Sequence, residues 1–129
     1  MPESRHVLLA LSDKDGHGVL VSTLAGKGLD PIYASTLTEA RSVLKREPVA
    51  MMFCEDQLED GTFRDILSEN ARGEGQVPVV VCSSSDDQRL YLDAMWLGAF
   101  DFIAYPYSPR EIDWIVNCAL SRAKAAGAA

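Results

Sequence analysis

Short apolar runs and segments with helical periodicity alternate along the whole chain. The apolar runs are typical of strands buried on both faces of a sheet, and they occupy residues 6–11, 31–34, 49–54, 77–82 and 102–104. Between them, apolar residues recur three or four positions apart, which is the pattern of a helix with one buried face. Five strands that alternate with five helices predict a parallel sheet, covered by helices on both sides and joined by right-handed connections.

Two of the predicted helices begin with clear capping signals. Ser108 is followed by Pro109 and Glu111, so an N-cap hydroxyl, a first-turn proline and a capping-box carboxylate stand in order. Thr36 and Glu39 form the same kind of pair before the second helix. These signals fix the starts of two helices without any tertiary information.

Length and composition indicate one globular domain. The chain has 129 residues, of which 47% are hydrophobic and 24% charged, and we expect the domain to cover residues 1–122, with an alanine-rich tail or linker at 123–129. A net charge of −7 argues against nucleic acid and anionic membrane as partners, since both attract basic surfaces. No apolar run approaches the roughly 20 residues of a membrane span, and no secretory signal is evident. We therefore expect a cytoplasmic location.

Candidate chemistry is expected at the carboxyl ends of the strands, where sheets of this type bind their ligands. The polar residues at these ends are mostly acidic or hydroxylic. They are Ser12 and Asp13 after the first run, Glu55, Asp56 and Gln57 after the third, Ser83 after the fourth and Tyr105 after the fifth.

Five short motifs, in order along the chain, carry a resemblance to a known family. They are Leu-Glu-Asp-Gly at 58–61, Val-Pro-Val-Val-Val at 77–81 before a hydroxyl residue, Gly-Ala-Phe-Asp-Phe at 98–102, Pro106 before an aromatic residue, and the helix start at 108–111. Together they resemble the receiver domain of bacterial two-component response regulators over about residues 5–122. The resemblance implies a flavodoxin-like, three-layer α/β/α fold with strand order 2-1-3-4-5.

In that family an aspartate after the third strand accepts a phosphoryl group from a histidine kinase. An acidic pair after the first strand helps to bind Mg²⁺, and a hydroxyl residue and a lysine contact the phosphoryl oxygens. The resemblance places Glu55 at the acceptor position, Leu11 and Ser12 at the acidic pair with Asp13 just beyond, Ser83 at the hydroxyl, Tyr105 at the lysine, Phe102 at a switch aromatic and Pro106 at a cis-proline.

These departures predict a pocket that does not accept phosphate. Tyr105 removes the fixed cation that the phosphoryl group needs, and a metal site would retain only Asp13, Glu55 and the Gln57 carbonyl. Mg²⁺ requires near-octahedral geometry, and glutamate extends its carboxylate about 1.5 Å farther than aspartate. We expect no cofactor, and Mg²⁺ binding that is weak if it occurs at all.

Several alternatives stay open at this point. Glu55 either mimics a permanently charged acceptor, which predicts Ser83 turned toward it, or belongs to a domain kept only as a scaffold. Phosphorylation at Glu55 or Asp56 is the alternative function, although we expect Asp56 to point away from the pocket because adjacent side chains alternate in an extended segment. An enzyme or cofactor binder on the same fold is a less favoured alternative. The acidic segment 12–18 would repel the phosphate of a bound cofactor. Asp13 and Asp15 have the spacing of a phosphatase pair, but no lysine stands at a later strand end to support one.

Three aromatic residues suggest an interaction surface. Trp96, Phe100 and Trp114 fall outside the apolar stripes of their segments, on the face that receivers commonly use to dimerise. Exposed tryptophans are frequent interface residues. We expect protein partners, either a histidine kinase or a downstream effector, and a homodimer through the face formed by the fourth helix, fifth strand and fifth helix.

The remaining reactive residues have simpler explanations. Cys54 and Cys82 are expected to be buried apolar residues rather than a redox pair. His6 and His17 are expected at the surface.

Overall fold

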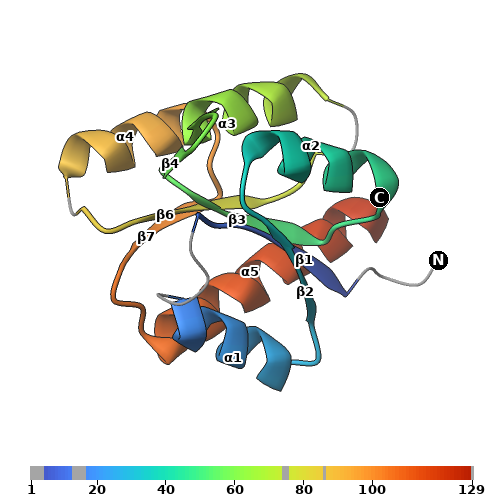
Figure 1. Ribbon diagram of the computed structural model, residues 1–129. Helices are drawn as coiled ribbons and strands as arrows, with labels where there is room; N and C mark the ends of the chain where they lie inside the picture. The colour runs from blue at the N-terminus through green and yellow to red at the C-terminus, as the bar shows by residue number, and fades with distance from the viewer. Residues whose placement is uncertain (1–4, 13–16, 74–75, 86, 129) are drawn as a thin grey trace.

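The computed structural model describes the backbone of residues 5–12, 17–73, 76–85 and 87–128, and side chains in these ranges as far as residue 121. Five parallel strands form one sheet in the order β2-β1-β3-β6-β7 (Figure 1). They are β1 (His6–Ala10), β2 (Asp30–Ala34), β3 (Met51–Glu55), β6 (Val79–Ser83) and β7 (Asp101–Ala104). A short antiparallel pair, β4 (Gln57–Leu58) and β5 (Gly61–Thr62), follows β3. Because β4 and β5 lie outside the main sheet, β6 and β7 are its fourth and fifth strands. The predicted flavodoxin-like fold with strand order 2-1-3-4-5 is therefore confirmed.

Helices cover both faces of the sheet. They are α1 (Gly18–Gly26), α2 (Leu37–Arg46), α3 (Phe63–Arg72), α4 (Gln88–Trp96) and α5 (Pro109–Ala128). Figure 1 shows α1 and α5 on one face and α2, α3 and α4 on the other. Among the described helices, none is both long and apolar enough to cross a membrane. Residues 123–128, which the sequence assigned to a tail, continue the backbone of α5.

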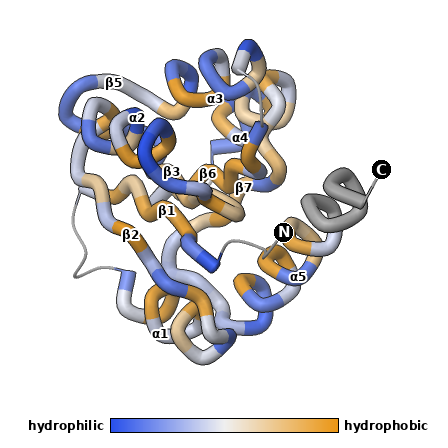
Figure 2. Tube along the Cα trace, turned by 90° about the vertical axis from the view of Figure 1, so that its right-hand side faces the viewer, coloured by the Kyte–Doolittle hydropathy of each residue, from blue (hydrophilic) through white to orange (hydrophobic). Residues whose placement is uncertain are grey.

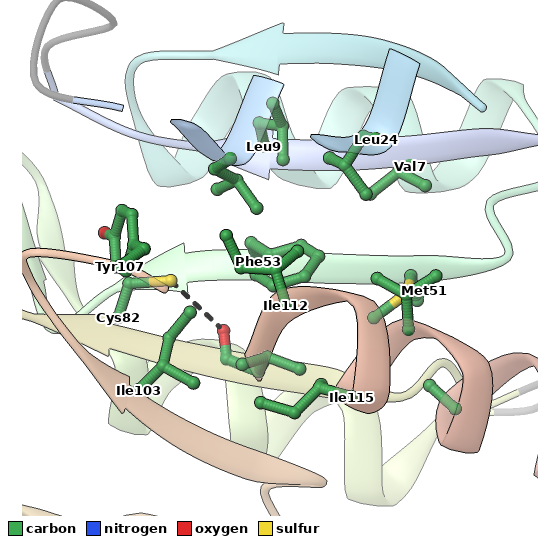
Figure 3. Packing of buried hydrophobic residues seen from close by; sticks show 14 of the residues in the cluster. Val7, Leu9, Leu24, Met51, Phe53, Cys82, Ile103, Tyr107, Ile112 and Ile115 are labelled. Atoms are coloured by element: carbon green, nitrogen blue, oxygen red, sulfur yellow. Dashed lines mark hydrogen bonds between the residues drawn. The ribbon is translucent and has the colours of Figure 1, made fainter. Parts of the chain in front are cut away.

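The apolar runs are continuous because each central strand is packed on both sides. On β1, Val7 and Leu9 pack with α1 and α5, whereas Leu8 and Ala10 pack with the opposite helices. The strands β3 and β6 alternate in the same way between the two cores. Figure 2 shows these apolar strands enclosed between the helices, and Figure 3 shows one core, where Phe53 lies among side chains from the sheet and from α5. The pattern of strands that are apolar throughout thus follows from burial on both faces.

The chain order places a switch point beside β1. The connection after β1 leads to β2 on one side, and the next connection leads to β3 on the other. Sheets of this type open a crevice at such a point, outside the carboxyl ends of the strands. The structure therefore brings the ends of β1 and β3 to the place where a site is expected.

The start of α2 is capped by a carboxylate from the turn between β4 and β5. Asp60 accepts hydrogen bonds from the backbone N–H of Leu37 at 2.7 Å, from the backbone N–H of Thr38 at 3.0 Å and from the Thr38 hydroxyl at 2.8 Å. The bond from Leu37 is the main reason that the pKa of Asp60 lies below its ordinary value. The turn after β3 is thereby tied to the first turn of α2.

Replacing Asp60 with alanine should destabilise the domain in a pH-dependent way. Because the folded-state pKa of Asp60 is lowered, its contribution is present above the unfolded pKa of about 4 and is lost as the pH falls through the folded pKa. Urea unfolding should therefore show a deficit for Asp60→Ala at neutral pH that shrinks in acid. The control Glu59→Ala, at an exposed neighbour, should match the wild type. Equal stability of Asp60→Ala and wild type at pH 7 would contradict this account of the cap.

Candidate functional site

A cavity of about 310 Å³ opens at the carboxyl edge of the sheet. Its walls come from the segment between β1 and α1, from the ends of β3 and β6, and from the segment after β7. The lining residues are His17, Glu55, Asp56, Cys82, Ser83, Ser84, Tyr105 and Tyr107. Glu55, Asp56, Ser83 and Tyr105, which the sequence singled out, therefore lie in one place.

Both carboxylate oxygens of Glu55 are already engaged by the protein. The Ser12 backbone N–H donates to Oε1 at 3.0 Å and the Ser12 hydroxyl donates to Oε2 at 2.8 Å. His17 Nε2 lies 3.1 Å from Oε1. Since an ionised carboxylate only accepts hydrogen bonds, the proton of this contact belongs to Nε2.

The other nitrogen of the His17 ring contacts Tyr107. The Tyr107 hydroxyl lies 2.9 Å from His17 Nδ1, and the two rings are stacked with centroids 5.5 Å apart. Burial raises the pKa of Tyr107, so its hydroxyl stays protonated at neutral pH. In the neutral imidazole one nitrogen donates and the other accepts; Tyr107 then donates to Nδ1, while Nε2–H donates to Glu55. We call Ser12, Glu55, His17 and Tyr107 the clasp, because it joins the ends of three strands.

The structure corrects the expectation for His17. Sequence reasoning put this histidine at the surface, yet only 8% of it is exposed. Its position in the sequence could have predicted this burial, because His17 ends the segment that follows β1 at the switch point and directly precedes α1. A polar residue at that edge has access to the crevice.

The prediction that Asp56 points away from the pocket is wrong. Asp56 lines the cavity together with Glu55, and the Ser83 hydroxyl donates to Asp56 Oδ2 at 3.0 Å. Side chains alternate only within a strand, and β3 ends at Glu55, where the backbone bends at Asp56. Ser83 therefore bonds to Asp56 and not to Glu55, which is the opposite of what the acceptor-mimic hypothesis predicted.

Tyr105, which the resemblance places at the lysine position, brings an aromatic ring to the cavity and no positive charge. It is 49% exposed at the cavity, and its ring meets Tyr107 edge-on with centroids 5.6 Å apart. The Tyr105–Pro106 peptide bond is cis, as the resemblance implied. Among the described residues that line the cavity, none is lysine or arginine.

The described residues do not fit a magnesium site. Asp13 lies outside the described residues, Gln57 is exposed in β4, and the Glu55 oxygens accept bonds from Ser12 and His17. Within the described part of the chain, no three His, Cys, Asp or Glu side chains are grouped to hold a metal.

The two buried cysteines lie on opposite faces of the sheet. Cys54 belongs to the core under α2 and α3, and Cys82 to the core under α1 and α5. Burial raises the pKa of both thiols, that of Cys54 to about 12, so neither is an activated thiolate at neutral pH. A redox pair does not form between them.

The aromatic residues of the α4–β7–α5 face differ in exposure. Trp96 on α4 is 90% exposed and Trp114 on α5 is 70% exposed. Phe100 is half-buried and packs against the core under α1 and α5, so it offers less surface than the sequence predicted. Phe102 is half-buried as well, with its ring edge-on to Tyr91 at 5.9 Å.

Comparisons with known proteins agree on one class. The response regulator PilR of Pseudomonas aeruginosa is 30% identical over 118 residues, which are 91% of this chain and 26% of that protein. The response regulator SaeR of Staphylococcus aureus is 24% identical over 119 residues, 92% of this chain and 52% of that protein. This chain thus spans about a quarter to a half of the curated relatives named here. No family model matches the sequence.

Solved structures match over nearly the whole chain. The receiver domain of a LuxO repressor protein from Vibrio parahaemolyticus has a TM-score of 0.88 at 18% identity, covering 96% of this chain and 95% of that one. The beryllofluoride-activated NtrC4 receiver domain, a dimer, has a TM-score of 0.85 at 19% identity, covering 92% and 98%. The fold is therefore the receiver fold. With the relatives above, this chain is a response-regulator receiver domain, the class that works in two-component signalling.

Removing the Tyr107 hydroxyl tests whether the clasp stabilises the fold. In Tyr107→Phe the Nδ1 atom of His17 loses its donor, and we expect a loss of about 1–2 kcal/mol in the free energy of unfolding, as for a buried polar group left unpaired. Urea unfolding measures this loss. Tyr91→Phe, at an exposed tyrosine with a ring contact to Phe102, should change stability by less than about 0.5 kcal/mol. Equal values for the two variants would contradict the account.

Proposed function

We propose that this receiver domain signals through protein contacts without being phosphorylated. The observation that carries the proposal is the state of Glu55: the resemblance implies that it takes the acceptor's place, and both its oxygens are bonded inside the clasp. Attack on a phosphorus atom would compete with these bonds, and the described residues that line the cavity include no lysine or arginine.

Electrostatics disfavours an added phosphoryl group in this cavity. The group brings between −1.5 and −2 charges at neutral pH, and it would lie beside the carboxylates of Glu55 and Asp56. Phosphoryl transfer depends on cations that neutralise the developing charge. The two carboxylates repel that charge, and the aromatic rings and neutral hydroxyl groups of the described lining residues cannot neutralise it.

One observation favours a second candidate function. Asp56 lies in the cavity and receives a hydrogen bond from Ser83, the hydroxyl residue that contacts the phosphoryl group in the family. Asp56 is therefore the substitute acceptor to test, with Glu55 as the other. We favour the first proposal because Asp56 also lacks a cation among the lining residues.

Incubation with acetyl phosphate and Mg²⁺, followed by intact mass measurement, separates the two functions. We expect an unmodified chain, because the described residues that line the cavity include no cation to neutralise the phosphoryl charge. A stoichiometric increase of about 80 Da, one phosphoryl group, would contradict the proposal. Loss of that increase in Asp56→Asn, but not in Glu55→Gln, would then identify Asp56 as the acceptor.

The contact surface we propose is the α4–β7–α5 face, used for a homodimer or for a kinase or effector protein. Trp96 and Trp114 are the largest exposed apolar side chains on it, and tryptophan often contributes most to interface energy. The NtrC4 receiver is a dimer. The net charge of −7 disfavours nucleic acid as a direct partner. We place the domain in the cytoplasm, a reducing compartment in which cysteine thiols do not form disulfides.

Charged substitutions at the two tryptophans test this surface. Trp96→Glu combined with Trp114→Glu should raise the dimer dissociation constant at least tenfold, since burying an unpaired carboxylate is costly. Analytical ultracentrifugation over a concentration series measures the change. Val19→Glu, at an exposed position on α1, is the matched control. A wild-type chain that stays monomeric, or variants that dimerise as it does, would contradict the homodimer.

A further inference from the structure

The cavity at the carboxyl edge carries negative charge that its own lining only partly satisfies. Glu55 accepts three hydrogen bonds inside the clasp. Asp56 accepts the Ser83 hydroxyl at Oδ2, and the described residues provide no hydrogen-bond donor to its Oδ1. Half-buried carboxylates favour a cation beside them, and the described residues that line the cavity include no lysine or arginine.

The walls of the same cavity are aromatic. His17, Tyr105 and Tyr107 line it, with Tyr105 edge-on to Tyr107 at an interplanar angle of 87° and half-exposed at the cavity. Aromatic faces attract organic cations. Their presence beside a carboxylate is a separate observation from the negative charge, and it favours a cation that is weakly hydrated.

These two features select among cations. A hard dication such as Mg²⁺ requires several oxygen ligands in octahedral geometry, and the described residues do not group to supply them. A guanidinium is planar, stacks on aromatic rings and donates two parallel hydrogen bonds to one carboxylate. The lining of this cavity suits a guanidinium better than a metal ion.

We propose that the cavity receives the guanidinium of an arginine side chain from a protein partner, with Asp56 as its carboxylate and Tyr105 as its aromatic wall. The volume of about 310 Å³ accommodates it, since a water molecule takes roughly 30 Å³ and a guanidinium has only four heavy atoms. The partner then supplies from outside the cation that receivers hold at the Tyr105 position. This inference rests on the proposed function, because a phosphoryl group on Asp56 would occupy the carboxylate that the guanidinium is proposed to bind.

Two peptides that differ at one central residue test the proposal, and their other residues are uncharged. The central residue is arginine in one peptide and citrulline, which has the same shape without the charge, in the other. Titration into the ¹⁵N-labelled chain should show the arginine peptide shifting the amide signals of Asp56, Ser83 and Tyr105, with an affinity at least tenfold above that of the citrulline peptide. Equal affinities, or shifts confined to other surfaces, would overturn the proposal.

Variants locate the binding and control for net charge. Tyr105→Lys supplies a cation within the chain and should weaken arginine-peptide binding at least tenfold, whereas Tyr105→Phe keeps the ring and should bind as the wild type does. Asp56→Asn should weaken binding at least tenfold, whereas Glu47→Gln, which removes the same charge from an exposed position beyond α2, should not. Unchanged binding by folded Tyr105→Lys would overturn the proposal.

A lysine of the chain itself is the competing source of the cation. Lys14 lies outside the described residues, and Lys14→Ala decides the question. We expect its affinity for the arginine peptide to stay within about threefold of the wild type, a change under 1 kcal/mol. A tenfold gain would show that Lys14 fills the cavity and would overturn the assignment to a partner. Phosphorylation is measured separately by mass, so the two failures are distinguishable. Arginine binding can fail while the chain stays unphosphorylated, and phosphorylation can occur while the arginine peptide still binds.

Discussion

The arrangement of this site depends on one chain of hydrogen bonds, from Ser12 through Glu55 and His17 to Tyr107. It joins the end of β3 to the segments that follow β1 and β7, which are far apart in sequence and meet at the edge of the sheet. Every polar atom in it has a partner, so it adds order without an unsatisfied buried group. Here the side chains of Ser12, Glu55, His17 and Tyr107 make these links without an added phosphoryl group.

The fold could be predicted because its two cores impose a readable pattern. A strand covered on both faces has to be apolar throughout, and the runs at 49–54 and 77–82 are, so the parallel sheet followed from the sequence. The edge that carries the site followed as well, from the order of the strands. The contacts within the site could not be predicted from the sequence, because they depend on where the backbone bends after β3 and on how far a histidine ring reaches across the crevice. Asp56 and His17 were therefore misplaced.

The two proposed contact regions use different physical interactions. The α4–β7–α5 face presents Trp96 and Trp114 to solvent, and burial of apolar area would drive association there. The cavity presents carboxylates and aromatic rings, which select a cation by charge and shape. A domain with both surfaces can bind a partner by burying apolar area at the tryptophans. It can also recognise that partner by one cationic side chain that enters the cavity. Neither interaction requires a covalent phosphoryl group.

The protonation pattern of the His17 ring tests the central claim most directly. Long-range ¹H–¹⁵N correlation spectra of the imidazole, recorded at slightly alkaline pH, distinguish the two neutral tautomers. The clasp predicts a proton on Nε2, held by Glu55, and an unprotonated Nδ1 that accepts the Tyr107 hydroxyl. A ring protonated at Nδ1, or one exchanging freely between tautomers as an exposed histidine does, would contradict the account.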